Sequence, residues 1–203
     1  MIRAFLAVEL SEELRATLAT LQQELKQSIE PDLKRGTRIS WVQPASLHLT
    51  IKFLGETDEQ VIDPLRAAVE QAIGRQMAVN VPLERLSGFP RPQSPRVLWV
   101  GPSENWEKGI DAKRITEIYA TIEQACEGLR FLRETKPFNP HLTVARIKTG
   151  ERHVGVSLAQ SGVLDRPILL GSLAVESVAL MKSELKPTGS VYTKLWSVRL
   201  SGK

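Results

Sequence analysis

The tripeptide His-Leu-Thr occurs twice in this chain of 203 residues, as His48-Leu49-Thr50 and His141-Leu142-Thr143, although the chain has only three histidines. Each copy follows a proline-containing turn and opens an apolar segment typical of a β-strand. The two copies are 141 − 48 = 93 residues apart, close to half of the chain. This repetition predicts two structurally related lobes, each placing one copy on a strand that faces a shared cleft.

The hydrophobic pattern elsewhere predicts strands and helices that alternate along the chain. We expect strands over residues 2–9, 39–42, 47–54, 77–86, 96–100, 141–147, 173–182 and 191–200, and helices over 11–29, 57–73, 105–128 and 156–161. The chain is long enough to bury a real core. It is therefore predicted to be an α+β protein, with residues 1–203 forming a single domain made of the two lobes.

Strand geometry gives the repeated motif a chemical meaning. Because side chains alternate across a strand, His48 and Thr50 share one face, and His141 and Thr143 share another. Two such faces would surround a phosphate with imidazole and hydroxyl donors. In-line displacement at phosphorus requires one neutral imidazole to activate water and one protonated imidazole to protonate the leaving oxygen. A histidine pKa near 6.5 populates both forms at neutral pH, so neither metal nor cofactor is required.

Charge is unevenly distributed around the second motif. The formal net charge is only +4, but residues 130–152 contain six basic and two acidic residues. Residues 85–101 contain three arginines and no Asp or Glu. Basic side chains beside a candidate site fit an anionic ligand. The alternative is that they only solvate strand ends and loops.

Several functional classes are disfavoured by what the sequence contains. Cys126 is the only cysteine and falls in a helical pattern, so we expect a buried structural thiol and no disulfide. His153 lies in a charged stretch and is expected at the surface, and no Cys, His or Asp spacing suggests a metal site. Residues 1–10 do not resemble a signal peptide, and no apolar run has membrane-spanning length. We therefore expect a cytoplasmic protein.

Two segments resemble the signature motifs of the 2H phosphoesterases: Leu47–Glu56, which reads LHLTIKFLGE, and Pro140–Arg146, which reads PHLTVAR. More closely, the chain is similar to the RNA 2′,3′-cyclic phosphodiesterases once described as 2′-5′ RNA ligases. Further similar segments are Arg3–Val8, Trp41-Val42, Gly88–Pro90, Arg96–Gly101 and Tyr192–Leu195. The resemblance implies a bilobal, pseudo-symmetric α+β fold in which two antiparallel sheets line a central cleft and the helices lie outside.

The resemblance also implies an activity and its residues. The expected reaction is hydrolysis of a terminal 2′,3′-cyclic phosphate on RNA to a 2′-phosphomonoester, without metal or cofactor. His48 matches the proton donor to the leaving 3′ oxygen, His141 matches the proton acceptor, and Thr50 and Thr143 match phosphate-binding hydroxyls. The near-symmetry of the two motifs leaves the residues alone unable to assign donor and acceptor, so this order comes from the resemblance.

Other aromatic residues are weaker candidates for RNA contacts. Trp41 and Phe89 each adjoin a loop and are candidates for stacking on a base, as aromatics do in single-strand binding sites. Phe53 shares the strand face of Leu49, and alternation therefore predicts that it packs in the core.

Basic residues near the motifs are candidates for contacting the RNA backbone. Lys52 shares the strand face of His48, although a solvated strand end explains it equally well. Arg96 and Arg146 are candidates for clamping phosphate, yet alternation places Arg146 away from His141.

Two alternatives stay open at this point. The same site would permit the reverse reaction, 2′-5′ ligation of RNA, and the chain could instead be an RNA-end-binding module without catalysis. Related cyclic or 2′,5′-linked nucleotides are alternative ligands. Protein partners and oligomeric state are not indicated by the sequence.

Overall fold

The computed structural model describes residues 1–166, 168–186 and 189–201. Its four α-helices within that range are α1 (Glu12–Ile29), α2 (Ile62–Ile73), α3 (Ile110–Gly128) and α4 (Glu151–Ser161). The strands are β1 (Ile2–Glu9), β2 (Arg38–Trp41), β3 (His48–Thr57), β4 (Val79–Pro82), β5 (Arg85–Phe89), β6 (Val97–Gly101), β7 (Leu142–Thr149), β8 (Ser172–Val175), β9 (Ser177–Lys186) and β10 (Gly189–Arg199).

Two antiparallel sheets organise these strands. The larger sheet has eight strands in the order β10-β9-β1-β3-β7-β6-β5, with β2 also paired to β7, and the smaller sheet pairs β4 with β8. Within the larger sheet, β3 and β7 pair through Leu49 opposite Leu142 alone. This narrow contact joins two halves of the sheet, one around β1, β9 and β10 and the other around β5, β6 and β2.

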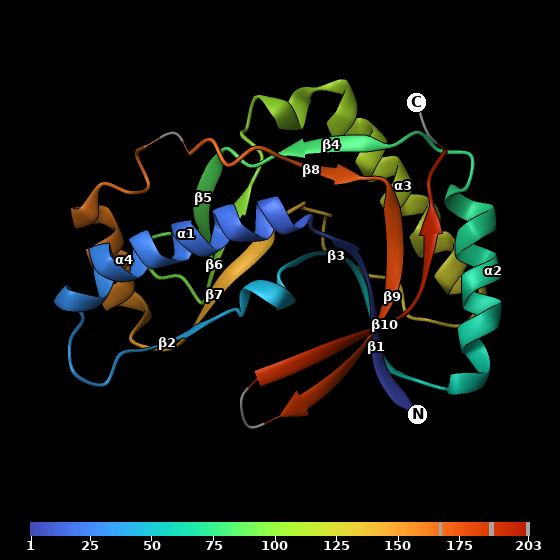
Figure 1. Cartoon of the computed structure of the whole chain (residues 1–203), viewed down its shortest axis with the longest axis horizontal. Coiled ribbons are helices and arrows are strands. Elements are labelled where there is room, and N and C mark those ends of the chain that lie inside the picture. The colour runs from blue at the N-terminus through green and yellow to red at the C-terminus, as the bar shows by residue number, and fades with distance from the viewer. Residues whose placement is uncertain (167, 187–188, 202–203) are drawn as a thin grey trace.

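The helices lie outside the sheet halves. Figure 1 shows α1 and α4 beside β5, β6 and β7, while α2 and α3 lie on the other side of the molecule near β9 and β10, and β4 and β8 run across the top. The α+β class and its antiparallel sheets are thus confirmed. The division of residues 1–203 into two related lobes stays a prediction.

Helix α1 illustrates how local sequence sets this arrangement. The Ser11 side chain accepts a hydrogen bond from the Leu14 amide at 3.2 Å, which caps the helix where the sequence predicted a start. Leucines at helical spacing bury one face of α1. From that face, the Gln22 amide donates to the carbonyl oxygens of Val42 and Val144, each at 2.8 Å. Helix α1 therefore covers the side of β7 that carries Leu142 and Val144.

Some predicted elements differ from the structure. The single strands expected over 77–86 and 173–182 are each divided, into β4 and β5 and into β8 and β9. In both segments the chain passes from the small sheet to the large one, which side-chain patterning does not reveal. The helix expected over 156–161 already begins at Glu151, after Gly150 turns the chain with φ of 85°.

Two smaller expectations can also be compared with the structure. Cys126 is fully buried in α3, as expected, and burial raises the pKa of its thiol to about 11. In the described part of the chain, every helix is too short or too polar to cross a membrane.

Candidate active site

The two His-Leu-Thr motifs lie side by side at the junction of the sheet halves. Leu49 of β3 is opposite Leu142 of β7 in an antiparallel pair. Continuing that register by one residue in each direction places His48 opposite Thr143 and Thr50 opposite His141. Directly opposed side chains have Cβ atoms about 5 Å apart, and diagonal ones are about 7–8 Å apart. The four side chains therefore form a square on one sheet face, with the two imidazoles at diagonal corners.

Both imidazole rings are held in the same way. Nδ1 of His48 lies 2.8 Å from the carbonyl oxygen of Ser46, and Nδ1 of His141 lies 2.7 Å from the carbonyl oxygen of Asn139. A carbonyl oxygen only accepts, so each Nδ1 carries a proton and donates it. In the neutral ring Nε2 is then the free acceptor, and it is available for proton transfer.

Aromatic rings surround each imidazole. The His48 ring lies 4.8 Å from the Phe5 ring and 5.2 Å from the Tyr192 ring, measured between centroids. The His141 ring lies 5.0 Å from Phe89 and 6.1 Å from Trp99. Phe89 thus lies beside a motif histidine, and its stacking on a base stays a prediction. Phe5, Trp99 and Tyr192 were missed, because only the pairing of distant strands places them beside a motif histidine.

The surroundings of the two rings favour their neutral forms. Burial lowers the pKa of both His48 and His141 below the ordinary value of 6.5, against the opposing effect of the backbone hydrogen bonds. The Arg146 guanidinium lowers both pKa values further, and the His141 ring contributes to lowering that of His48. Arg146 and both imidazoles therefore lie close enough to interact electrostatically.

The position of Arg146 corrects the expectation that it points away from His141. In the pairing of β7 with β6, Leu98 is opposite Ala145 but Trp99 is opposite Thr143, so Val144 is an extra residue in β7. Such a bulge shifts the alternation by one residue. Val144 and Ala145 are both buried, and Arg146 is exposed on the side that carries Thr143.

The same irregularity follows the first motif and corrects the expectation for Phe53. In the pairing of β1 with β3, Leu6 is opposite Lys52 but Ala7 is opposite Thr50, so Ile51 is the extra residue. Phe53 therefore joins the face of His48 and Thr50 instead of packing in the core, and it is 66% exposed. Its ring lies 6.1 Å from that of Phe5.

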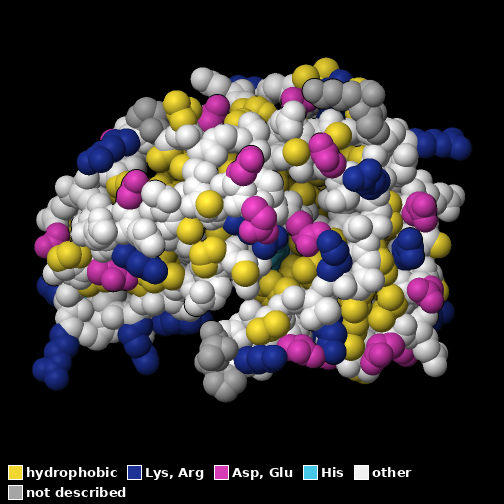
Figure 2. Space-filling model, viewed as in Figure 1, with side chains coloured by type: hydrophobic (Ala, Val, Ile, Leu, Met, Phe, Trp, Pro, Cys, Tyr) yellow, Lys and Arg dark blue, Asp and Glu magenta, His cyan; other side chains and the backbone are white. Residues whose placement is uncertain are grey.

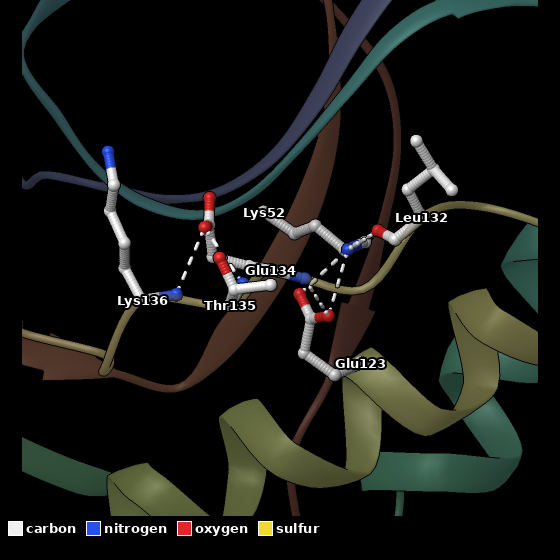
Figure 3. Close-up of polar contacts among 6 residues, drawn as sticks. All are labelled: Lys52, Glu123, Leu132, Glu134, Thr135 and Lys136. Atoms are coloured by element: carbon white, nitrogen blue, oxygen red, sulfur yellow. Dashed lines mark hydrogen bonds and ion pairs between the residues drawn. The ribbon is translucent and has the colours of Figure 1, made fainter.

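The bulge also removes Lys52 from the face on which the sequence placed it. Lys52 is 4% exposed, and its Nζ lies 2.8 and 2.9 Å from the two carboxylate oxygens of Glu123 in α3. The same Nζ donates to the carbonyl oxygen of Leu132, and the Glu134 amide donates to the Glu123 carboxylate (Figure 3). Lys52 thus anchors the segment between α3 and β7 and is not available to an RNA backbone.

Two further candidates lie away from the motif histidines. Trp41 packs against the α1 side of the sheet, where its Nε1 donates to Glu30 at 2.8 Å and Lys26 lies over its ring. The structure therefore does not bring Trp41 to the cleft. The Arg96 side chain is 78% exposed and its Nε lies 3.8 Å from a Glu151 carboxylate oxygen, beside the start of α4.

Two cavities flank the square of motif residues. One has a volume of about 650 Å³ and is lined by His48, Tyr192 and the turn before β3. The other, of about 830 Å³, is lined by Thr50, His141 and four aromatic residues: Phe53, Phe89, Tyr119 and Phe138. Both volumes lie in the range of small-ligand sites. Figure 2 shows the surface hollowed near the centre of the molecule and notched along its lower edge.

The polar groups of the site suit an anion better than a metal. Over the described ranges, His, Cys, Asp and Glu side chains do not gather in groups of three or more. The groups at the cleft are two imidazoles, two hydroxyls and a guanidinium. The hydroxyls, the guanidinium and an imidazole protonated at Nε2 are each able to donate a hydrogen bond to a phosphate oxygen.

An antiparallel α+β fold with paired His-Leu-Thr strands at its centre defines a 2H phosphoesterase. Residues 8–99 and 110–192 match the family described as LigT like Phosphoesterase, and the chain belongs to this family. The resemblance drawn from the two motifs is therefore confirmed.

Relatives of similar length support this assignment. A protein of Methanothermobacter thermautotrophicus named RNA 2′,3′-cyclic phosphodiesterase is 32% identical over 199 residues, which cover 98% of this chain and 99% of that one. A Thermus thermophilus protein of the same name is 34% identical over 206 residues, covering 100% of this chain and 92% of that one. The crystal structure of a Thermus thermophilus protein, TT0787, matches with a TM-score of 0.69 and 32% identity, covering 100% of both chains.

Proposed function

We propose that this protein hydrolyses the 2′,3′-cyclic phosphodiester at an RNA end and leaves a 2′-phosphomonoester. The observation that carries the proposal is the pairing of Leu49 with Leu142, which sets His48 and His141 at diagonal positions of adjacent strands, together with the bond of each Nδ1 to a backbone carbonyl, which leaves Nε2 for proton transfer. The names of the full-length relatives as RNA 2′,3′-cyclic phosphodiesterases support the substrate.

In this mechanism the two histidines have opposite protonation states. Neutral His141 accepts a proton from water at Nε2 as the water oxygen bonds to phosphorus. The bond from phosphorus to the 3′ oxygen breaks, and protonated His48 gives its Nε2 proton to that oxygen. Each proton transfer contributes a factor of about 10²–10⁴ to the rate. The order of donor and acceptor follows the family resemblance, because the geometry of the two rings is nearly the same.

The other groups of the square stabilise the phosphate. The hydroxyls of Thr50 and Thr143 donate to the non-bridging oxygens, which gain negative charge in the transition state. Arg146 adds a positive charge near both imidazoles. Because these donors are fixed by the strands, little reorganisation is needed when charge develops.

The cavity of about 830 Å³ suits the nucleoside attached to the cyclic phosphate. It adjoins Thr50 and His141, and the exposed Phe53 ring offers a surface on which a base can stack. The 2′,3′-cyclic phosphate would then lie between the imidazoles.

Two variants test the proposal, with the third histidine as a matched control. We expect His48→Ala and His141→Ala each to reduce hydrolysis of a 2′,3′-cyclic nucleotide by about 10²–10⁴-fold while the circular dichroism spectrum is unchanged. His153 is exposed on α4, so His153→Ala should keep full activity.

Full activity in either motif variant would contradict the mechanism. Binding of RNA ends by the unmodified protein without any turnover would instead support a binding module. If RNA halves that end in a 2′,3′-cyclic phosphate and in a 5′-hydroxyl yield more 2′-5′-ligated than hydrolysed product, the reverse reaction is the main activity.

A further inference from the structure

A row of exposed basic side chains continues from the second motif along the open face of the sheet. Beyond the bulge in β7, Arg146 and Lys148 are exposed while Ile147 between them is buried. On the neighbouring strand β2, Ser40 is opposite Arg146 and Arg38 is opposite Thr149, and both β2 residues are exposed. Arg38, Arg146 and Lys148 therefore lie on the face that carries Thr143; we call these three residues the basic strip.

The basic strip leads to a second group of basic residues. At the end of β7, a hollow of about 910 Å³ is lined by Arg91, Arg96, Arg152 and His153, and by Glu151 as its one acidic residue. The Ile147 amide donates to the Arg96 carbonyl, so this hollow directly adjoins the strip. Figure 2 shows Lys and Arg side chains gathered along the lower left edge of the molecule, in the region of β2.

The charges of the strip are not neutralised by neighbouring acids. Within the described ranges, the ion pairs of the protein do not include Arg38, Arg146 or Lys148. Like charges on adjacent strands repel each other. A row of such charges beside a phosphate site is complementary to a chain of phosphates.

The length of the strip exceeds the needs of a single nucleotide. Thr143 and Lys148 are separated by about 13 Å along β7, at roughly 3.3 Å for each of the four steps that remain when one residue is lost to the bulge at Val144. A mononucleotide whose cyclic phosphate lies between the imidazoles places its only phosphate at the Thr143 end. Only a polynucleotide has further phosphates to reach Arg38 and Lys148.

We propose that the basic strip binds the sugar-phosphate backbone of the RNA strand whose cyclic end lies between the two imidazoles. The inference rests on the proposed function and narrows its substrate to RNA chains of several nucleotides. Contacts of this kind position a strand without reading its sequence, so binding should be largely independent of base order.

The test compares substrates of increasing length. With the wild-type protein, kcat/KM should rise from a 2′,3′-cyclic mononucleotide to an RNA of about six nucleotides with the same end. In Arg38→Ala/Lys148→Ala, the value for the RNA should fall on the order of tenfold at low salt, while that for the mononucleotide is unchanged. For RNA binding, the plot of log affinity against log salt concentration should be less steep in this variant than in the wild type. The slope should be smaller in magnitude by roughly 1.4, or about 0.7 for each of the two lost phosphate contacts.

Two further variants separate charge from structure. Arg38→Lys/Lys148→Arg keeps both charges and should restore the preference for RNA. Arg66→Ala/Arg75→Ala removes two exposed arginines on and just after α2, on the other side of the molecule, and should change nothing (Figure 1).

The possible failures are distinguishable. Two results overturn the strip and leave the proposed function intact. One is an equal kcat/KM of the wild-type protein for the mononucleotide and the RNA. The other is an Arg38→Ala/Lys148→Ala variant that keeps the full preference for RNA. Wild-type protein that hydrolyses neither substrate overturns the proposed function. The strip is then judged by fluorescence anisotropy with the same RNA, where weaker binding by the double alanine variant supports it and unchanged binding overturns it.

Discussion

The strands β3 and β7 carry the same tripeptide in nearly the same setting, but the residues that follow it differ in charge. Both motif histidines are bound through Nδ1 to the carbonyl two residues earlier, and both strands bulge directly after the threonine. The third residue after the threonine is the exposed Phe53 in β3 and the exposed Arg146 in β7. The same backbone geometry therefore places an aromatic side chain, Phe53, beside the first motif and a cationic side chain, Arg146, beside the second.

The second residue after each threonine differs as well. It is Lys52 in β3, held in a buried ion pair with Glu123, and the small buried Ala145 in β7. The β3 side thus depends on a buried charge pair that the β7 side lacks. This difference indicates that the segment from α3 to β7 is fixed in place from the β3 side.

The largest expected effect comes from breaking that ion pair. Lys52→Met keeps much of the side-chain volume but leaves the Glu123 carboxylate buried without its cation. We expect the free energy of unfolding in urea to fall by about 3–5 kcal/mol. Lys52→Met/Glu123→Met removes both charges and should recover a large part of the loss. If the free energy of unfolding of Lys52→Met is less than about 1 kcal/mol below that of the wild type, the pair is not important for stability.

Replacing Arg146 should affect the chemical step. Arg146→Ala removes a charge close to both imidazoles and to the proposed phosphate position. We expect kcat for a 2′,3′-cyclic mononucleotide to fall about 10²-fold, as on loss of one transition-state donor. Arg146→Lys should retain part of the activity, since it keeps the charge but not the planar donor pair. A change in KM alone would place Arg146 in ground-state binding only.

Phe53→Ala should give the opposite kinetic pattern. Loss of a stacking surface weakens binding of the base by about 1–3 kcal/mol but leaves the reacting groups in place. We therefore expect a higher KM and an almost unchanged kcat. Phe53→Tyr keeps the ring and serves as the matched control. A fall in kcat equal to that of Arg146→Ala would mean that Phe53 and Arg146 do not have different roles.

The smallest expected effect is a shift of the pH profile. Burial lowers the pKa of both imidazoles, so each loses its proton at a lower pH than free histidine with its pKa of 6.5. The form with one neutral and one protonated ring is then most populated below pH 6.5, and kcat/KM should have its maximum there. Arg146→Ala removes a cation that lowers both pKa values, so its profile should move to higher pH. A wild-type maximum above pH 7 would contradict this.

Spacing and alternation were sufficient to predict the parts of the site that depend on local strand geometry. The α+β class and the joint placement of each His and Thr follow from such patterns. The strand faces that Phe53 and Arg146 occupy do not follow from such patterns. A bulge of one residue is visible only in the register with a neighbouring strand.

Contacts between residues that are far apart in the sequence were equally impossible to predict from local patterns. Lys52 and Glu123 are 71 residues apart, and Tyr192 lies 192 − 48 = 144 residues from the histidine that its ring contacts. No periodicity in one segment indicates which distant segment it will meet. The sequence therefore indicated that the His and Thr of each motif share a strand face, but not that Phe5, Trp99 and Tyr192 lie beside the two imidazoles.

The division of labour between the two strands is tested most directly with a substrate in which sulfur replaces the bridging 3′ oxygen. A thiolate leaves without needing a proton, so the substrate removes the need for a general acid. We predict that His48→Asn, whose amide can still donate to Ser46, hydrolyses this substrate at nearly the wild-type rate, whereas His141→Asn stays inactive. Rescue of the His141 variant alone would reverse the assignment, and equal inactivity of both variants would contradict separate acid and base roles.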